Sequence, residues 1–465
     1  MTIKQPNQQQ TDNESNNIVR QSLWYSLLAL LVYVFWRTSR YLNRLLRQPR
    51  LVYDLIRSDH SSPDEIKAQA LLIATGNIRS GIEKRLMTNG EEKWVLCAGI
   101  RNFREPWARD FGFASFGLLN MEETEVVRDC LEVFLIHQQP NGHFPVKVHS
   151  TNVVDRYLHS LLGKQQPNFI PIRPKYITAH NTISLDGNGL LVVAALHYLN
   201  TTGDRDFLRR YWVNLKRGVT WMEETAGLED GLLQQGPYTD WADSIARTGR
   251  IIYTNIIYWK ALEQLAEAAG RYGQALDQEI FSEKAAQVAQ AINDHFWRDD
   301  LGYYVTSKQF DTILSSPGNL LAIAWGLTTP EQAHSILDKM AVLKMAEPVP
   351  TQVTNEAYPS DYIGIENRLA GIKQYHTHAA WLWIGGWHVV ALTRMGRLEE
   401  AEAVLQRICQ TIVHDGVVHE VYDQNGDYLS TFWYTSEAPL TWSAAVVVHA
   451  HHILTHAASE RGDRV

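Results

Sequence analysis

Acidic residues stand beside large aromatic residues in three separated parts of the chain, namely 101–111, 236–244 and 414–443. A glycosidic bond is cleaved by two carboxyl groups. One protonates the leaving oxygen and, in inverting enzymes, the other activates a water molecule from the opposite side. Flat aromatic rings nearby offer surfaces on which a sugar can stack. The candidate stacking residues are Trp107, Tyr238, Trp241, Tyr358, Tyr375, Tyr422, Trp433 and Tyr434.

The segment 236–244 places Asp240 and Asp243 on either side of Trp241, with Tyr238 close by. A single aspartate in a loop often serves only solvation or capping, but a pair around an indole ring is more specific. Burial against an indole disfavours the charged carboxylate and raises its pKa, which a general acid needs near neutral pH. Either aspartate is a candidate proton donor, and the whole group is a candidate sugar-binding set.

The third segment offers two glutamates. Alternation of residues 418–422 predicts a short strand that places Glu420 and Tyr422 on one face. Glu420 is the candidate general base. Glu437 is the alternative base, although it could equally be a first-turn acid of the last helix. Trp433 lies between the two glutamates in sequence and is a candidate substrate contact.

Asp110 lies near the first turn of a predicted helix, where the helix dipole favours an acidic residue. A purely structural role therefore competes with a functional one. The neighbouring Trp107 and Arg109 favour a clamp on sugar hydroxyls. Asp186, at the start of another predicted helix, and His376, in a long loop, complete the candidate substrate contacts.

Several other kinds of chemistry find little support in the sequence. His376 and His378 are spaced i, i+2, which does not place both on one helical face for metal ligation. The Gly385-Gly386 pair lacks a nucleotide fingerprint. The net charge is −8, without a basic stripe in the body of the chain, which argues against nucleic-acid binding. The three cysteines form neither a metal pattern nor a disulfide framework, so we expect no metal and no cofactor.

A helical period dominates from about residue 63 onward, and about twelve helices pair as hairpins with short links. The predicted helices are 64–87, 108–120, 122–138, 186–201, 204–225, 253–270, 276–297, 317–327, 330–343, 376–395, 397–413 and 437–456. Every second connection is long: 139–185, 226–252, 298–316, 344–375 and 414–436. Long loops in a compact domain usually carry function. This alternation predicts an all-α, (α/α)6 toroid in which residues 60–460 form one catalytic domain with the loops lining a single funnel.

The N-terminal part has a different composition. Residues 1–20 are mostly polar and predicted to be disordered. Residues 21–50 are predicted to be a membrane-anchor helix, because the apolar run 23–36 is followed by five arginines. The run is shorter than the ~20 residues of a full span, so a half-inserted helix and an amphipathic helix packed on the domain stay open. A removable signal is disfavoured because no small-residue cleavage site follows. The arginines would place the catalytic domain on the cytoplasmic side.

Taken in order, these strings resemble the inverting (α/α)6-barrel glycosidases, most of all the neutral/alkaline invertases and the amylo-α-1,6-glucosidase domain of glycogen debranching enzymes. Residues 107–111, Trp-Ala-Arg-Asp-Phe, look like the invertase string VRDF. Residues 240–243, Asp-Trp-Ala-Asp, are similar to the invertase DWID and the debranching WMD strings. Residues 419–423, His-Glu-Val-Tyr-Asp, are similar to PEYYD, and residues 441–443 match TWS. The resemblance spans about 95–446.

This resemblance implies that Asp243 is the general acid and Glu420 the base of an inverting hydrolase acting on an α-linked glucoside or a short oligosaccharide. Invertases continue DWID with Asp-Arg, whereas this chain has Ser244-Ile245, so sucrose is not implied. Three alternatives stay open. A phosphorylase on the same toroid needs a basic phosphate pocket, and an epimerase needs paired histidines, for which His376, His378 and His419 are available. The third is a membrane-tethered, non-catalytic carbohydrate-binding protein. The sequence makes no prediction of the oligomeric state.

Overall fold

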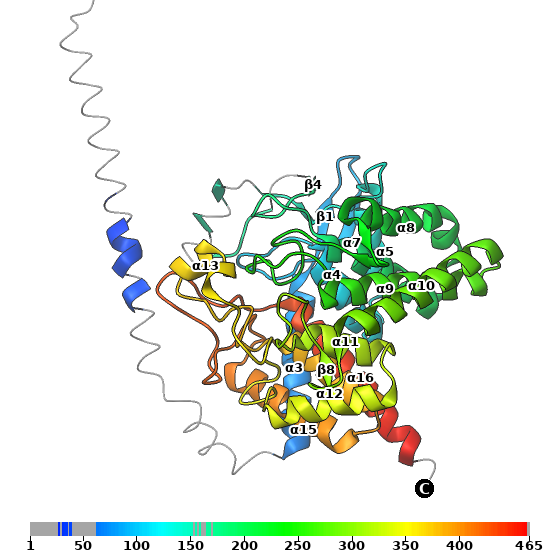
Figure 1. Cartoon of the computed structure of the whole chain (residues 1–465). Helices are drawn as coiled ribbons and strands as arrows, with labels where there is room; N and C mark the ends of the chain where they lie inside the picture. The colour runs from blue at the N-terminus through cyan, green and yellow to red at the C-terminus, as the bar shows by residue number, and fades with distance from the viewer. Residues whose placement is uncertain are drawn as a thin grey trace, which may run out of the picture.

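A computed structural model describes residues 27, 30–35, 37–39, 62–151, 154–155, 158–159, 164–168 and 171–462 (Figure 1). Its helices are α3 (Pro63–Gly81), α4 (Ala108–Asn120), α5 (Thr124–Ile136), α7 (Leu185–Thr202), α8 (Arg205–Ala226), α9 (Ile252–Arg271), α10 (Ala275–Phe296), α11 (Ser316–Trp325), α12 (Pro330–Val342), α13 (Ile365–Leu369), α14 (Leu382–Arg394), α15 (Leu398–Asp415) and α16 (Thr441–Gly462), with the short 3-10 helix η1 (Ser360–Tyr362). The described strands form two-stranded antiparallel sheets: β1 (Ile82–Leu86) with β2 (Glu92–Leu96), β3 (Lys147–His149) with β4 (Arg173–Lys175), β5 (Leu228–Glu229) with β6 (Leu232–Leu233), and β7 (Trp297–Arg298) with β8 (Tyr303–Tyr304).

Alternate helices form a closed inner ring. Each inner helix packs against the next in the order α4, α7, α9, α11, α14, α16, and α16 returns to α4. These helices are apolar on nearly all sides, as expected for helices that are covered all round; α7 and α11 are buried along almost their whole length. The partner helices lie outside, as where α10 packs on α9 and α3 packs on α15 and α16. This is the predicted mostly helical six-hairpin architecture.

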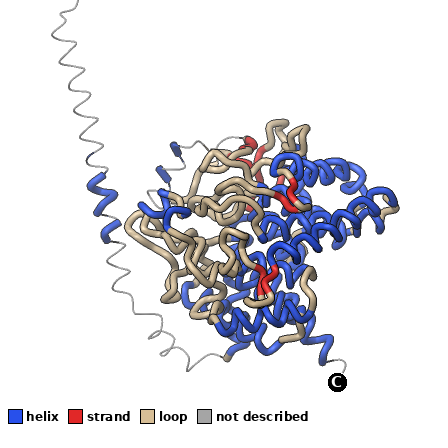
Figure 2. Tube along the Cα trace, viewed as in Figure 1, coloured by secondary structure: helices blue, strands red, loops and turns tan. Residues whose placement is uncertain are grey.

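A repeated hydrogen bond holds the long loops over the N-terminal ends of the inner helices. An N–H at or just before the start of each inner helix donates to a carbonyl in the long segment that leads into the next one. The first N–H groups of a helix have no partner within it, so the pairing both satisfies them and fixes the loops. Figure 2 shows the loops gathered on one side of the molecule. The pairs, with N···O distances, are Ala108 to Val146 (2.9 Å), Leu185 to Thr239 (2.9 Å), Ile252 to Thr306 (3.1 Å), Ser316 to Val353 (2.9 Å), Ala380 to Tyr422 (2.9 Å) and Thr441 to Ala98 (2.9 Å).

Glycines allow the inner helices to approach closely. A Cβ on Gly117 of α4 would lie 2.0 Å from the backbone oxygen of Ala445 on α16. A Cβ on Gly386 of α14 would lie 2.8 Å from the side chain of Val446. Real Cβ atoms are not found so close to other atoms. The contacts of α4 and of α14 with α16 are therefore possible only because these two residues are glycines without a side chain.

Most predicted helices agree with the structure within a few residues, and three predictions need correction. Residues 82–86 form β1 and do not continue the first helix. The helix predicted from residue 376 begins at Leu382, because Ala380 is drawn into bridges with Gln352 and Tyr422. The strand predicted at 418–422 does not form; Tyr422 makes only isolated bridges, to Ala380 and Tyr428.

The predicted disordered segment 1–20 lies outside the described residues, and the predicted anchor 21–50 lies largely outside them. Within the described part, residues 30–35 and 37–39 are helical. No helix built from described residues is both long enough and apolar enough to cross a membrane.

Candidate active site

A pocket of about 120 Å³ lies among the long loops and the first turns of α4 and α16. It brings together residues from the three acid-and-aromatic segments, together with part of the loop before α14. Both Asp243 and Glu420 reach it, although they are far apart in sequence. Its lining is Phe103, Trp107, Arg109, Asp110, Trp241, Asp243, Tyr375, His376, Trp381, Glu420, Leu440 and Trp442.

Asp243 stands in the pocket as the more accessible carboxyl group. Its side chain is 39% exposed, and Arg109 Nη1 lies 3.9 Å from its Oδ2 atom. Desolvation by the surrounding protein raises the pKa of Asp243 to about 6, while the positive charge of Arg109 opposes the shift. A carboxyl group that stays protonated to about pH 6 is suited to donate a proton.

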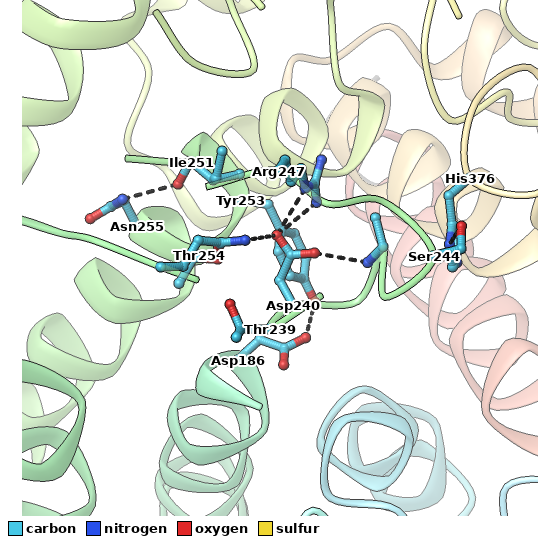
Figure 3. Close-up of polar contacts among 12 residues, drawn as sticks. Asp186, Thr239, Asp240, Ser244, Arg247, Ile251, Tyr253, Thr254, Asn255 and His376 are labelled. Carbon is cyan, nitrogen blue, oxygen red and sulfur yellow. Dashed lines mark hydrogen bonds and ion pairs between the residues drawn. The ribbon is translucent and has the colours of Figure 1, made fainter. Parts of the chain in front are cut away.

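The sequence predicted that Asp240 contacts the sugar. The structure instead places Asp240 behind the pocket, outside its lining. Asp240 is 1% exposed, and its carboxylate accepts a hydrogen bond from Arg247 Nε at 3.0 Å (Figure 3) and another from Gln235 Nε2 at 2.8 Å. Its other oxygen accepts from the N–H of Ala242 at 2.9 Å. Asp240 therefore orders the turn that presents Asp243, while Trp241 between them lines the pocket.

Asp186 also lies outside the pocket lining, as the fully buried partner of Arg109. Arg109 Nε donates to Asp186 Oδ2 at 2.5 Å, and Ser184 Oγ donates to Oδ1 at 2.6 Å. Tyr253 OH donates to Oδ2 at 3.2 Å (Figure 3). The pair fixes the guanidinium group at the pocket wall and balances its charge.

Glu420 has donors on both carboxylate oxygens. Tyr375 OH donates to Oε1, Tyr434 OH donates to Oε2 at 2.6 Å, and the N–H of Glu437 donates to Oε2 at 3.1 Å. The side chain of Glu420 is 4% exposed, so its orientation is set by these contacts. Hydrogen bonds of this kind match the negative charge of a carboxylate, which is the form that accepts a proton from water.

Glu437 is placed differently from Glu420 and does not line the pocket. It is fully buried, and its Oε1 atom accepts from the N–H groups of Arg101 (2.6 Å) and Asn102 (3.0 Å). Burial raises the pKa of Glu437, against the charge of Arg101. Its carboxyl group holds the segment 101–102 in place, so of the two glutamates only Glu420 lines the pocket.

Asp110 lines the pocket as a third carboxyl group. Burial raises its pKa to about 7, Arg109 opposes the shift, and the charges of Glu420 and Asp243 reinforce it. Several carboxylates sharing one pocket cannot all carry a charge at little cost. A protonated Asp110 has both a donor and an acceptor to offer a sugar hydroxyl.

The aromatic walls include residues that the sequence analysis did not assign to the site. Trp241 packs edge-to-face on Trp381, with ring centroids 5.7 Å apart, and on His376, at 4.8 Å. His376 Nδ1 lies 2.8 Å from Ser244 Oγ (Figure 3), and burial lowers its pKa far below the usual value. Trp107, Trp381 and Trp442 all lie at the start of an inner helix. This shared position in the sequence could have identified Trp381 and Trp442 as residues of the site. Phe103 belongs to the acid-and-aromatic segment 101–111, but nothing in the sequence assigned it a role of its own.

The remaining predicted contacts lie elsewhere. Tyr238 is not part of the lining and stacks on His180, with centroids 4.5 Å apart. Trp433 is 58% exposed and also lies outside the lining. Tyr358 and Tyr422 are buried in the core and do not serve as sugar platforms there. Among the described residues, no cluster of three or more His, Cys, Asp or Glu side chains could hold a metal ion.

Comparison with known proteins places this chain in a wider group. The family model described as the bacterial alpha-L-rhamnosidase six-hairpin glycosidase domain matches residues 101–349, a little over half of the chain. The N,N'-diacetylchitobiose phosphorylase of Vibrio proteolyticus is 23% identical over 237 residues, which cover 45% of this chain and 29% of that protein.

Two solved structures illustrate the likeness in fold. The rhamnosidase from Klebsiella oxytoca with rhamnose bound superposes with a TM-score of 0.60 at 16% identity, over 84% of this chain and 64% of that one. The GH63 mannosylglycerate hydrolase from Thermus thermophilus, in complex with Tris and D-glycerate, gives a TM-score of 0.58 at 12% identity, over 83% and 99%. The chain thus spans less than two thirds of that rhamnosidase and less than a third of the phosphorylase.

Proposed function

This chain belongs to the family of bacterial alpha-L-rhamnosidase six-hairpin glycosidase domains, and from that premise we propose that it is a glycosidase that hydrolyses a terminal α-linked sugar with inversion at the anomeric carbon. One observation carries the proposal: Asp243 and Glu420 share a single pocket, Asp243 with a raised pKa and Glu420 held by two tyrosines.

In the proposed reaction, the carboxyl proton of Asp243 passes to the glycosidic oxygen as the bond to the anomeric carbon breaks. A water molecule attacks that carbon from the opposite side and gives its proton to Glu420. The cycle leaves Asp243 ionised and Glu420 protonated, and proton exchange with solvent restores both. Arg109, Asp110 and the surrounding tryptophans hold the sugar ring during the step.

The size of the pocket supports action on one sugar at a time. Drug-sized ligands occupy cavities of about 300–1,000 Å³, and this pocket holds about 120 Å³. We therefore propose removal of a single terminal residue from an α-linked glucoside or a short oligosaccharide. The α-D-glucosyl group follows from the sequence strings. An α-L-rhamnosyl group, suggested by the family, is the main alternative.

The charges in the pocket favour water over phosphate as the acceptor. A phosphorylase must bind a phosphate anion beside the sugar, whereas Asp110, Asp243 and Glu420 supply acidic groups and the charge of Arg109 is balanced by Asp186. An epimerase would need two histidines at the sugar. His376 is buried beside Ser244, and neither His378 nor His419 lines the pocket.

The test is a panel of aryl α-D-glucosides, α-L-rhamnosides and α-D-mannosides with short oligosaccharides, in which NMR follows the anomer released. We expect the inverted anomer, and a loss of about 10²–10⁴-fold in kcat for Asp243→Asn and Glu420→Gln. Asp361→Asn, an exposed acid outside the pocket, serves as the matched control. Retention of configuration, a rate that requires added phosphate, or full activity in both variants would overturn the proposal.

Membrane attachment through residues 21–50 is also a proposal, argued from the sequence. The apolar run and the arginines that follow it support attachment. The same arginines support a catalytic domain on the cytoplasmic side.

A further inference from the structure

The described N-terminal helix contacts the catalytic domain through two side chains one helical turn apart. Arg37 Nη2 donates to the carbonyl oxygen of Trp433 at 2.9 Å, and Arg37 Nη1 donates to Thr435 Oγ1 at 3.2 Å. The rings of Tyr33 and Trp433 have centroids 6.5 Å apart. These contacts, polar and aromatic, orient the helix on the domain.

The apolar side chains of this helix at Leu27, Leu30, Leu31, Val32, Val34 and Phe35 are exposed. Leu31 is 62% exposed, Val32 60% and Phe35 78%. An amphipathic helix that packs on its own domain buries its apolar side. Here the side that touches the domain carries Tyr33 and Arg37, so the described residues leave the apolar side uncovered.

The adjoining surface of the domain is also apolar. On α13, Ile365 is 58% exposed and Leu369 is 74% exposed, and Trp433 is 58% exposed. Thr431 Oγ1 donates to the carbonyl of Ala370 at 2.6 Å, which ties the loop of Trp433 to the end of α13. Figure 1 shows the described N-terminal helical residues, in blue, on the same side of the molecule as α13. Single exposed apolar residues are common, but a contiguous group marks an interaction site.

We infer that Ile365, Leu369 and Trp433, together with the described N-terminal helix, form a lipid-docking face that rests on an anionic bilayer. Tryptophan prefers the boundary between lipid and water. Arg368 and Lys373 are exposed beside the face, as are the acidic Asp361 and Glu366, so these four charges balance. The net attraction to anionic headgroups therefore comes from the N-terminal arginines, which are Arg37, Arg40, Arg44, Arg47 and Arg50 in the sequence.

The face borders the catalytic pocket, which gives it a consequence for the substrate. Tyr434, next to Trp433, donates to Glu420, and Tyr375, two residues after Lys373, lines the pocket. Docking would hold the pocket beside the headgroup layer. This step rests on the proposed function. The substrate is then a glycoside presented at a lipid surface, in which an apolar group is attached to the sugar that is removed.

The decisive experiment measures hydrogen exchange of the full chain with vesicles of phosphatidylcholine alone or mixed with phosphatidylglycerol. We expect protection of residues 365–369 and 431–434 with the mixed vesicles, and no change at the C-terminal end of α12. Binding without protection of these segments, or no binding, overturns the inference. Protection that appears without vesicles and grows with protein concentration assigns the face to a second copy and also overturns it.

A matched pair of variants tests the same face by flotation. Leu369→Gln with Trp433→Gln removes two exposed apolar side chains from the face and should weaken vesicle binding at least about tenfold. Val342→Gln with Leu276→Gln removes two similarly exposed side chains, 78% and 70% exposed, from α12 and α10 and should leave binding unchanged. Equal effects in both pairs refute the inference. Neither assay uses a glycoside, so both measure vesicle binding even where the chain proves not to be a hydrolase.

Discussion

At the scale of single residues, the acidic side chains of the site fall into two groups. Asp110, Asp243 and Glu420 line the pocket, whereas Asp186, Asp240 and Glu437 are buried against arginines that they hold in place. The sequence predicted which segments converge, because acids and aromatics recur together in them. It could not separate Asp240 from Asp243, since both belong to one four-residue string and only the direction of each side chain distinguishes them.

The raised pKa of Asp243 sets an expectation for the pH dependence of catalysis. A proton donor works only when protonated, and desolvation by the surrounding protein raises the pKa of Asp243 to about 6. The value of kcat/KM should therefore fall above about pH 6, and by about tenfold per pH unit well above it. A pH series on any substrate that is turned over tests this. A flat profile from pH 5 to 8 would show that Asp243 does not donate the proton.

Asp110 should lower the stability of the folded protein at neutral and higher pH. Its pKa is about 7 when folded and 3.8 ordinarily, so the folded state binds the proton more tightly. The stability that the folded state gains from this tighter proton binding is complete below pH 3.8 and is lost as the pH rises through 7. Asp110→Asn should therefore be more stable than wild type at pH 8, by up to about 4 kcal/mol, with the difference shrinking at pH 4. Denaturant unfolding at both pH values measures it, and a pH-independent difference would contradict the argument.

At the scale of elements, periodicity located the helices well because their apolar faces must be buried. The ends were harder to predict where tertiary contacts decide them. Residues 376–381 are compatible with helix, yet the bridges of Ala380 keep them out of α14. Residues 418–422 alternate like a strand, but only Tyr422 among them forms bridges. Trp381 escaped prediction as a site residue because its role follows from standing at the start of an inner helix.

The joint between α4 and α16 depends on Gly117. A Cβ there would meet the backbone of Ala445 at 2.0 Å, and backbone cannot move aside as a flexible side chain can. Gly117→Ala should lower the free energy of unfolding by at least about 2 kcal/mol. Gly76→Ala on α3, where nothing lies within 4 Å, is the matched control and should raise it by about 0.5–1 kcal/mol. Equal effects of the two substitutions in urea titrations would show that the joint is not tight.

At the scale of the whole molecule, six hairpins close into a ring through the backbone bonds that link each inner helix to the next loop. Sequence order and loop length suggested this closure. The sequence did not show that the ring would enclose ionisable side chains. His197, His388 and His449 lie on three different inner helices, α7, α14 and α16. His449 Nδ1 pairs with Asn120 Oδ1 of α4 at 2.7 Å, and His388 Nδ1 lies 3.1 Å from Thr351 Oγ1.

These histidines should make the whole fold sensitive to acid. Burial lowers the pKa of His197 and His388 to about 4 and that of His449 to about 3. The unfolded chain takes up their protons near pH 6.5 while the folded protein does not, so stability is complete above pH 6.5 and is lost as the pH falls toward the folded values. Each histidine costs about 2 kcal/mol at pH 5.

Asp110, Asp243 and Glu437 act in the opposite direction, because their pKa values are raised, but they are outnumbered by the histidines whose pKa values are lowered, which also include the buried His143 and the half-buried His295. The free energy of unfolding should therefore fall between pH 6.5 and pH 5, as followed by urea titration at each pH. His449→Gln should reduce the slope by about one proton, whereas His334→Gln, at an exposed position on α12, should leave it unchanged. A free energy of unfolding that rises steadily from pH 6.5 to 5 would mean that these carboxyl groups outweigh the histidines of the ring.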